Sequence, residues 1–238
     1  MNRLSMESAE HKQELLAYIR RFVNGQRLQR LEQVLDMRTR YISVVLENIF
    51  QAQNASAVLR SCECFGIQDV HIIEHHNPFE VNPEVAMGSD KWLSLTNYNE
   101  PGRDNTKECL QQLKARGYRI IATSPDKEGY TLESLPLDQK TALIFGTELN
   151  GISDQAKQMA DGYLHIPMRG FTESFNISVS VAICLYHLVT KMQTDVRHWQ
   201  LSDQEKTALM LEWVKKSVRN PEGIIQHYLN QVRKQNEV

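Results

Sequence analysis

The sequence predicts an α/β domain on a mostly parallel sheet with helices on both faces, and a helical extension at each end. Segments typical of strands and of helices alternate over about 150 residues of the middle of the chain, which favours parallel strands joined by covering helices. Residues 8–36 and the part beyond Trp199 show helical spacing instead. At 238 residues the chain can hold one such domain with terminal additions.

The first elements follow from a change of pattern near residue 40. Residues 8–36 have few helix breakers besides Gly25, and their apolar side chains recur at helical spacing. Residues 41–46 are rich in β-branched side chains, which predicts a strand. A helix is then expected to begin at Asn54 and to end at Gly66.

The rest of the α/β pattern is read in the same way. Further strands are predicted at 70–73, 92–95, 118–123, 142–145 and 163–167, and further helices at 105–116, 153–160, 176–193, 202–218 and 221–235. The strands at 142–145 and 163–167 each open into a loop of glycine and small polar residues, and each loop leads into a helix. Because open α/β sheets bind ligands at the carboxyl ends of their strands, these two loops indicate a binding site.

Composition excludes several classes of protein. The chain is 41% hydrophobic and 24% charged, as ordinary globular proteins are. No stretch approaches the roughly 20 apolar residues of a membrane helix, and the N-terminus has no apolar signal region. We therefore expect a cytoplasmic protein with no membrane partner. The four cysteines have no zinc-ligand spacing, so buried or half-buried free thiols and no metal are expected.

Charge is distributed unevenly although the net charge is only −2. Residues 1–50 and 191–238 each carry eight Lys or Arg against six Asp or Glu, and residues 51–190 carry eleven against seventeen. The excess is sharpest within 12–40, where the basic side chains are Lys12, Arg20, Arg21, Arg27, Arg30, Arg38 and Arg40. A basic arm of this kind can bind a polyanion. A solvated helix face would give the same pattern.

Asn54 and Arg60 form the first of three polar clusters in this otherwise apolar scaffold. They lie six residues apart at a predicted strand-to-helix junction, where a helix N-terminus and an arginine one turn later can hold a phosphate. An ordinary N-cap and an unrelated surface arginine are the alternative.

The other two clusters are the loops after the strands at 142–145 and 163–167. In the first, Gly146 and Gly151 bracket Glu148, which could accept a hydrogen bond from a hydroxyl or an amine. In the second, Ser174 and Asn176 exceed what one helix cap needs, and the backbone around residues 166–168 could bind a purine edge between apolar walls. A plain loop followed by a capped helix remains the alternative for each.

These three clusters, in this order, resemble the motifs of the SpoU branch of the knotted SPOUT methyltransferases, specifically the TrmH-like tRNA ribose methyltransferases. The matching patterns are Asn54-x-x-Ala57-x-x-Arg60 with Phe65-Gly66, then Gly146-x-Glu148-x-x-Gly151-x-Ser153, then Ile166-Pro167-Met168-x-Gly170 with Ser174-x-Asn176-x-Ser178-x-x-x-Ala182 and Tyr186. The resemblance spans roughly residues 40–192. Each motif is moderately specific, and their joint occurrence is highly specific. The chain departs from the usual pattern in having Phe175 and Ile177 where relatives have Leu and Val.

The resemblance implies a deep C-terminal trefoil knot, a rare exception to the rule against threaded chains. It also implies a homodimer whose active site draws on both subunits, and S-adenosyl-L-methionine as cofactor. The implied cofactor-binding residues are Thr123, Gly146, Ile166, Met168, Phe175 and Asn176. The implied catalytic residues are Arg60, Asn54, Glu148, Ser174 and Asn176.

Transfer of a methyl group to a tRNA ribose, at guanosine 18 of the D-loop, is the function that this resemblance implies. Residues 41–194 would form the methyltransferase domain, and the helical extensions 1–40 and 195–238 would bind tRNA. The alternatives are another RNA site (23S rRNA or the tRNA anticodon loop) and a non-catalytic knotted RNA-binding homologue. A Rossmann-type methyltransferase is rejected because residues 51–54 lack the glycine-rich turn that it requires.

Overall fold

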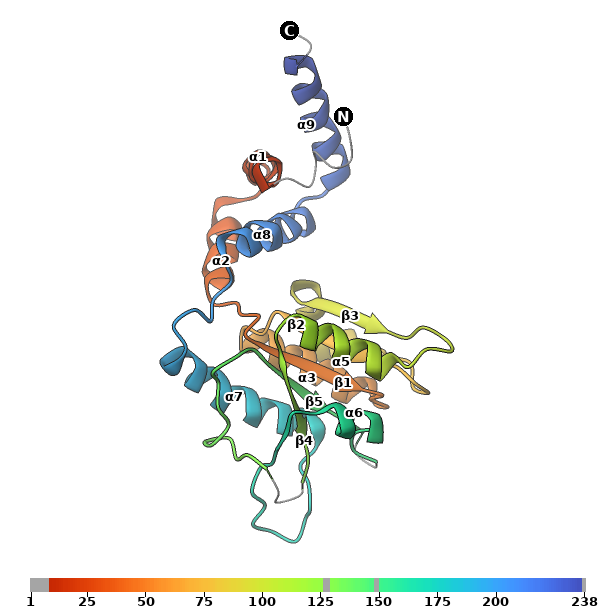
Figure 1. The fold of residues 1–238 in the computed structure, drawn as a ribbon. Coiled ribbons are helices and arrows are strands. Elements are labelled where there is room, and N and C mark those ends of the chain that lie inside the picture. Colours follow the sequence, from red (N-terminus) through yellow and green to blue (C-terminus); the bar gives the residue numbers. More distant parts are fainter. Residues whose placement is uncertain (1–8, 126–128, 148–149, 237–238) are drawn as a thin grey trace. The chain divides into compact units, whose positions relative to one another are not determined.

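The computed structural model describes residues 9–125, 129–147 and 150–236 of the chain. The chain divides into two compact units (Figure 1). One unit is the continuous segment Thr39–Trp199, and the other combines Met1–Arg38 with Gln200–Val238. Each unit is described by itself below.

The unit Thr39–Trp199 is built on a six-stranded, all-parallel sheet in the order β3-β2-β1-β5-β4-β6. The strands are β1 (Ile42–Glu47), β2 (Asp69–Ile73), β3 (Ser94–Tyr98), β4 (Arg119–Thr123), β5 (Thr141–Phe145) and β6 (Gly162–Leu164). The predicted α/β class and the parallel sheet are therefore confirmed.

Helices cover both faces of this sheet. Successive side chains of a strand point to opposite faces, and two neighbouring residues of β1 accordingly belong to two different apolar clusters. Val44 belongs to the apolar cluster that contains the buried side chains of α3 (Ala52–Cys64) and α7 (Ile177–Asp195). Its neighbour Val45 belongs to the second cluster, with α5 (Asn105–Ala115) and α6 (Asp154–Met159). Two short elements, α4 (Pro83–Ala86) and the 3-10 helix η2 (Ser89–Trp92), precede β3.

Some element boundaries differ from the prediction in ways that matter for the site. Helix α3 begins at Ala52, with Gln51 as its N-cap, rather than at Asn54. Strand β6 ends at Leu164, before Pro167, so residues 165–167 belong to a loop rather than to the strand. The predicted strand at 92–95 begins only at Ser94, because Trp92 ends η2.

The other unit is helical, as its spacing predicts. It contains α1 (Ala9–Arg20), α2 (Gly25–Asp36), α8 (Asp203–Ser217) and α9 (Pro221–Asn236). Helix α8 packs against α1 and α2, and α9 packs against α1. Buried side chains such as Ile19, Leu35 and Trp213 form the core, and Ser202 starts α8 with a capping box. Over the described ranges, no helix has both the length and the apolar character needed to cross a bilayer.

Candidate active site

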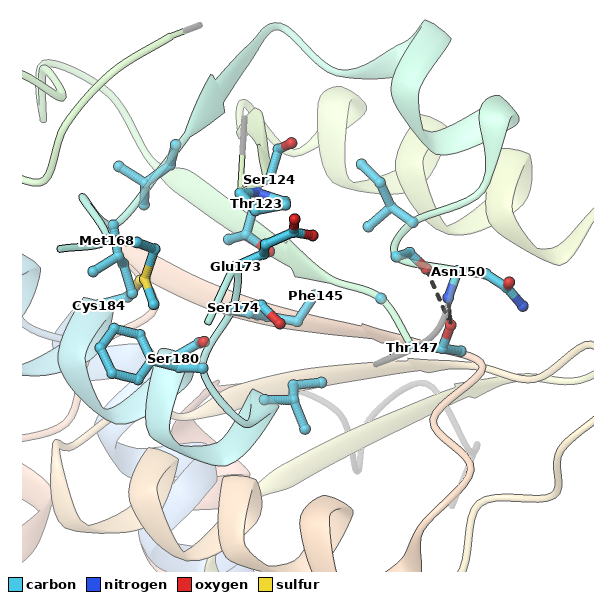
Figure 2. A pocket seen from close by; sticks show the side chains of 18 of the residues that line it. Thr123, Ser124, Phe145, Thr147, Asn150, Met168, Glu173, Ser174, Ser180 and Cys184 are labelled. Atoms are coloured by element: carbon cyan, nitrogen blue, oxygen red, sulfur yellow. Dashed lines mark hydrogen bonds between the residues drawn. The ribbon is translucent and has the colours of Figure 1, made fainter. Parts of the chain in front are cut away.

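A cavity of about 430 Å³ lies where β4, β5 and β6 end (Figure 2). Strand ends, the loops after β5 and β6, and one side of α7 form its walls. The lining residues are Thr123, Ser124, Pro125, Phe145, Gly146, Thr147, Asn150, Gly151, Ile152, Lys157, Leu164, Ile166, Met168, Glu173, Ser174, Phe175, Ile177, Ser180 and Cys184. The two loops that the sequence indicated as a ligand site therefore face one cavity.

Most of the residues expected to bind the cofactor line this cavity. Thr123, Gly146, Ile166, Met168 and Phe175 all do so. The hydroxyl of Thr123 donates a hydrogen bond to the carbonyl oxygen of Ile144 at 2.7 Å, so towards a ligand it can act only as an acceptor.

The loop after β5 closes tightly on itself. The backbone of Thr147 exchanges two hydrogen bonds with that of Gly151, at 3.0 and 2.9 Å. The Asn150 backbone N–H donates to the Thr147 hydroxyl (Figure 2). Gly151 has φ +64°, a conformation that favours glycine. A Cβ atom on Gly146 would lie only 2.1 Å from the Gly151 carbonyl oxygen. The closed loop thus requires glycine at both positions. Glu148 lies outside the described residues.

The loop after β6 offers backbone groups and apolar walls. Neither the N–H nor the C=O groups of Ile166 and Met168 form hydrogen bonds with the described part of the chain. Free backbone donors and acceptors between apolar side chains suit a flat heterocycle such as a purine. The volume is also within the range of sites for ligands of this size. The residues present therefore fit a nucleoside cofactor.

Asn54 and Asn176, which are 122 residues apart in sequence, are hydrogen bonded to each other. The Asn176 side chain caps α7 by accepting from the Ser178 amide, and its own amide donates to the Asn54 side-chain oxygen at 3.1 Å. Asn54 in turn donates to Gln51 at 3.0 Å. Ser174 lines the cavity, whereas Asn54 and Asn176 stand outside the lining set.

Arg60 lies elsewhere on the surface. Because α3 starts at Ala52, Arg60 is in its third turn, about 12 Å along the axis from the first residue. The prediction of an arginine one turn into the helix, beside its N-terminus, is therefore wrong. The Arg60 side chain is exposed, does not line the cavity, and makes no hydrogen bond or ion pair with the residues that the structure describes.

Sequence reasoning missed several polar residues of the cavity wall. Glu173 and Lys157 are the ionisable side chains among its described lining residues, apart from the thiol of Cys184, and Lys157 pairs with Asp154 at 3.2 Å. Ser124 directly follows β4, so the rule that ligands bind at carboxyl ends of strands could have found it. Nothing in the local pattern marks Glu173 or Lys157.

The cysteine that lines the cavity, Cys184, is a buried free thiol. Burial raises the pKa of the Cys184 thiol to about 12, so this lining residue stays protonated and unreactive. Cys62 and Cys109 are also buried, but Cys64 is exposed, contrary to the prediction of buried or half-buried thiols. Within the described ranges, no group of three or more His, Cys, Asp or Glu is arranged to hold a metal ion.

Comparison with known proteins decides the family. The profile of the SpoU rRNA Methylase family matches residues 41–186, more than half of the chain. The chain belongs to the SpoU methylase family. All three motif clusters lie inside the matched range.

Individual SpoU methylases are similar over most of their length. A tRNA (guanosine(18)-2'-O)-methyltransferase from Borreliella burgdorferi is 41% identical over 205 residues, which are 86% of this chain and 92% of that one. An enzyme of the same name from Aquifex aeolicus is 29% identical, over 81% of this chain and 90% of that one.

Solved SpoU structures share the fold. The Aquifex aeolicus TrmH/SpoU tRNA modifying enzyme matches with a TM-score of 0.72 and 28% identity, over 82% of this chain and 98% of that chain. The SpoU methyltransferase AviRb from Streptomyces viridochromogenes, in complex with the cofactor AdoMet, matches with a TM-score of 0.56 and 21% identity, over 68% of this chain and 64% of that chain.

Several basic side chains within residues 12–40 of this SpoU methylase already contact other groups of the protein. Arg20 pairs with Glu32, and Arg40 pairs with the aspartate that begins β2. Arg38 is fully buried, with its guanidinium carbon 5.3 Å from the centre of a Trp213 ring. These three basic side chains therefore already have partners within the protein, and charge alone gives weaker support for RNA binding than the sequence indicated.

Proposed function

We propose that this SpoU methylase transfers a methyl group from S-adenosyl-L-methionine to the 2′-oxygen of guanosine 18 in tRNA. One observation carries the proposal: 41% identity to a tRNA (guanosine(18)-2'-O)-methyltransferase over 86% of this chain and 92% of that one. Similarity of that extent includes parts of both helical ends as well as the sheet, whereas the matched 23S rRNA (guanosine-2'-O-)-methyltransferase RlmB is 28% identical over only 61% of this chain.

The cavity is the proposed cofactor site. When bound, the cofactor supplies a methyl group already activated on a sulfonium. Ile166 and Met168 would hold the purine through their free backbone groups, Phe175 would cover it, and Gly146 and Thr123 would form the cavity floor. With the methyl group activated in this way, the protein has mainly to orient the ribose hydroxyl and to exclude water.

The proposed catalytic set comprises Arg60, Asn54, Glu148, Ser174 and Asn176. A guanidinium stays protonated in proteins, so Arg60 acts as a cation that grips the neighbouring phosphate and stabilises the forming alkoxide, rather than as a base. Asn54 would orient the ribose or Arg60, and Asn176 would fix Asn54 through their hydrogen bond. Ser174 and Glu148 would shape the site of methyl transfer. Asn176 is also a proposed cofactor ligand.

We further propose a homodimer with active sites shared between subunits. Arg60 is exposed and outside the cavity of its own chain, which suits a role at the cavity of a second copy. Val179 and Tyr186, seven residues apart on one face of α7, are 42% and 68% exposed and would be covered by that copy.

The remaining proposals concern the path of the chain and the RNA. The segment after β6 would pass through the connection between β4 and β5 to form a trefoil knot. In support, β6 pairs with β4, and Lys191 of α7 donates hydrogen bonds to two carbonyl oxygens of that connection, at 2.6 and 2.8 Å. The helical segments 1–40 and 195–238 would bind tRNA, and no metal would take part.

The experiment is mass spectrometry of tRNA from cells that lack this protein. Loss of 2′-O-methylguanosine at position 18, and its return with the wild-type gene but not with Arg60→Ala, would support the proposal. Retention of that nucleoside together with loss of ribose methylation in the anticodon loop or in 23S rRNA would replace it with one of the other RNA targets. No change in any ribose methylation would favour a non-catalytic RNA-binding protein.

A further inference from the structure

A buried carboxylate stands at the carboxyl end of β1, beside β5 and outside the cavity lining. Glu47 is only 2% exposed. Its Oε1 accepts hydrogen bonds from the hydroxyls of Thr106, at 2.6 Å, and Ser153, at 2.7 Å, and its Oε2 accepts from the Ser153 amide at 2.8 Å. A carboxylate is costly to bury unless donors compensate it, and here the donors come from two helix N-termini distant in sequence.

Ser153 is the residue through which Glu47 reaches the cavity. It is the N-cap of α6, with its hydroxyl oxygen accepting from the Ala156 amide at 3.1 Å. It directly follows Gly151 and Ile152, which line the cavity. The loop after β5 is therefore held at one end by β5 itself and at the other by the two hydrogen bonds from Ser153 to Glu47.

The same corner also holds the loop after β2. Asn48 follows Glu47 with φ +55°, and its side-chain oxygen accepts from the amides of residues 75, 76 and 77, at 3.3, 3.0 and 3.0 Å. The His75 ring nitrogen Nε2 lies 2.9 Å from the Thr106 hydroxyl and 3.7 Å from Glu47 Oε1. The end of β1 thus fixes two loops at the edge of the sheet where the cavity opens.

We propose that Glu47 is a positioning residue that, through Ser153, holds Gly151 and Ile152 of the cavity wall in the place where the cofactor binds. This inference rests on the proposed function, because it concerns the same cavity. Glutamine at position 47 would place an N–H₂ group where one oxygen now accepts from Ser153 or Thr106. That N–H₂ group cannot accept a hydrogen bond, so one of the hydrogen bonds to residue 47 would be lost and two donors would face each other. Gly151 and Ile152 would then leave their present position part of the time, and the apparent affinity for the cofactor would fall with the population of that position.

The experiment measures S-adenosyl-L-methionine binding by isothermal titration calorimetry for the wild type, Glu47→Gln, Ser153→Ala and the double variant. Ser43→Ala is the matched control, because Ser43 lies on the same strand, is fully buried, and donates a hydrogen bond at 2.9 Å to the Asp69 carbonyl, away from the cavity. Thermal unfolding and the KM for tRNA are measured alongside.

We expect each single variant to raise the Kd for the cofactor about tenfold or more, as loss of a hydrogen bond to a charged group predicts. The double variant should lose less affinity than the sum of the two single losses, because both substitutions weaken the same link between Glu47 and Ser153. The Ser43→Ala control should lose thermal stability without losing affinity for the cofactor. In the Glu47 and Ser153 variants the KM for tRNA should stay within about twofold of the wild-type value, because neither residue belongs to the proposed RNA-binding groups.

Two results would overturn the inference. A Glu47→Gln protein with lowered melting temperature but wild-type cofactor affinity would show a structural role only. Additive losses in the double variant would show that Glu47 and Ser153 act separately. If Glu47→Gln does not fold, Ser153→Ala alone decides, since unchanged affinity there refutes the link. A wild-type protein that fails to bind the cofactor would overturn the proposed function, and this inference with it.

Discussion

Replacing Gly146 by alanine tests whether the closed loop after β5 forms the cofactor cavity. The new Cβ would lie 2.1 Å from the Gly151 carbonyl oxygen and 2.4 Å from the Ile152 nitrogen, both backbone atoms. Cβ atoms essentially never come within 3.0 Å of a neighbour, so the loop must move by about 1 Å, because the atoms in the way are backbone atoms and not the end of a flexible side chain. That displacement breaks the pair of backbone hydrogen bonds between Thr147 and Gly151.

The magnitude follows from those two bonds. At about 1 kcal/mol each, their loss disfavours the closed loop by about 2 kcal/mol. The ratio of the closed to the open form would then fall about thirtyfold, and the apparent Kd for S-adenosyl-L-methionine would rise by up to about thirtyfold. Isothermal titration calorimetry measures this directly.

Gly170→Ala is the matched control for this prediction. Gly170 lies in the loop after β6, a Cβ atom added to it would meet no other atom within 4 Å, and it does not adopt a positive φ. Its substitution should leave the Kd within about twofold of the wild type. If Gly146→Ala binds the cofactor as well as Gly170→Ala does, the proposed role of the closed loop is refuted.

Three further outcomes are expected. Arg60→Lys should lower turnover about a hundredfold or more with unchanged cofactor affinity, because lysine lacks the planar fork; near-normal turnover in a tritium-transfer assay would contradict its role. Burial lowers the pKa of His71 to about 4, below its ordinary 6.5, so the unfolded chain takes up a proton first as pH falls. The free energy of unfolding should therefore drop by up to about 3 kcal/mol from pH 6.5 to 4. It is measured by urea titration at each pH; a His71→Gln protein whose free energy of unfolding falls with pH as much as that of the wild type would exclude this cause. A thiol reagent should modify Cys64 quickly in the native protein and Cys184 only after unfolding; fast loss of Cys184, seen by peptide mapping, would show that the cavity wall opens.

The sheet and the cavity could be predicted because they depend on local pattern. The apolar runs at 142–145 and 163–167 identify strands, and parallel strands bring their carboxyl ends to one edge. The loops that follow them therefore had to lie together, and Gly146 and Met168 do line one cavity. Spacing along the chain contains all of this information.

The parts that the sequence did not reveal depend on contacts between distant residues. Glu47 ends an apolar strand and would be expected to face solvent, because its partners Thr106 and Ser153 are 59 and 106 residues away. Arg38 would be counted as a free charge, although the indole of Trp213 covers it. Asparagine favours N-caps, which predicts a helix start at Asn54, but Gln51 holds that position without any side-chain cap bond.

The sharing of the active site between subunits can be tested by complementation. Arg60→Ala and Gly146→Ala each impair a different half of the proposed site. After subunit exchange, mixed dimers would hold one site with both halves intact, so an equimolar mixture should recover about a quarter of wild-type activity. A mixture no more active than its components would place Arg60 and the cavity in the same subunit.

Methylation of guanosine 18 can be observed directly with purified protein, S-adenosyl-L-methionine carrying a labelled methyl group, and a tRNA transcript with guanosine at position 18. We expect one methyl group per tRNA, located by mass spectrometry on the ribose of guanosine 18. We also expect no transfer to a matched tRNA that has 2′-deoxyguanosine at that position. Equal labelling of the 2′-deoxy tRNA, or a methyl group on any other nucleotide, would contradict the proposed function.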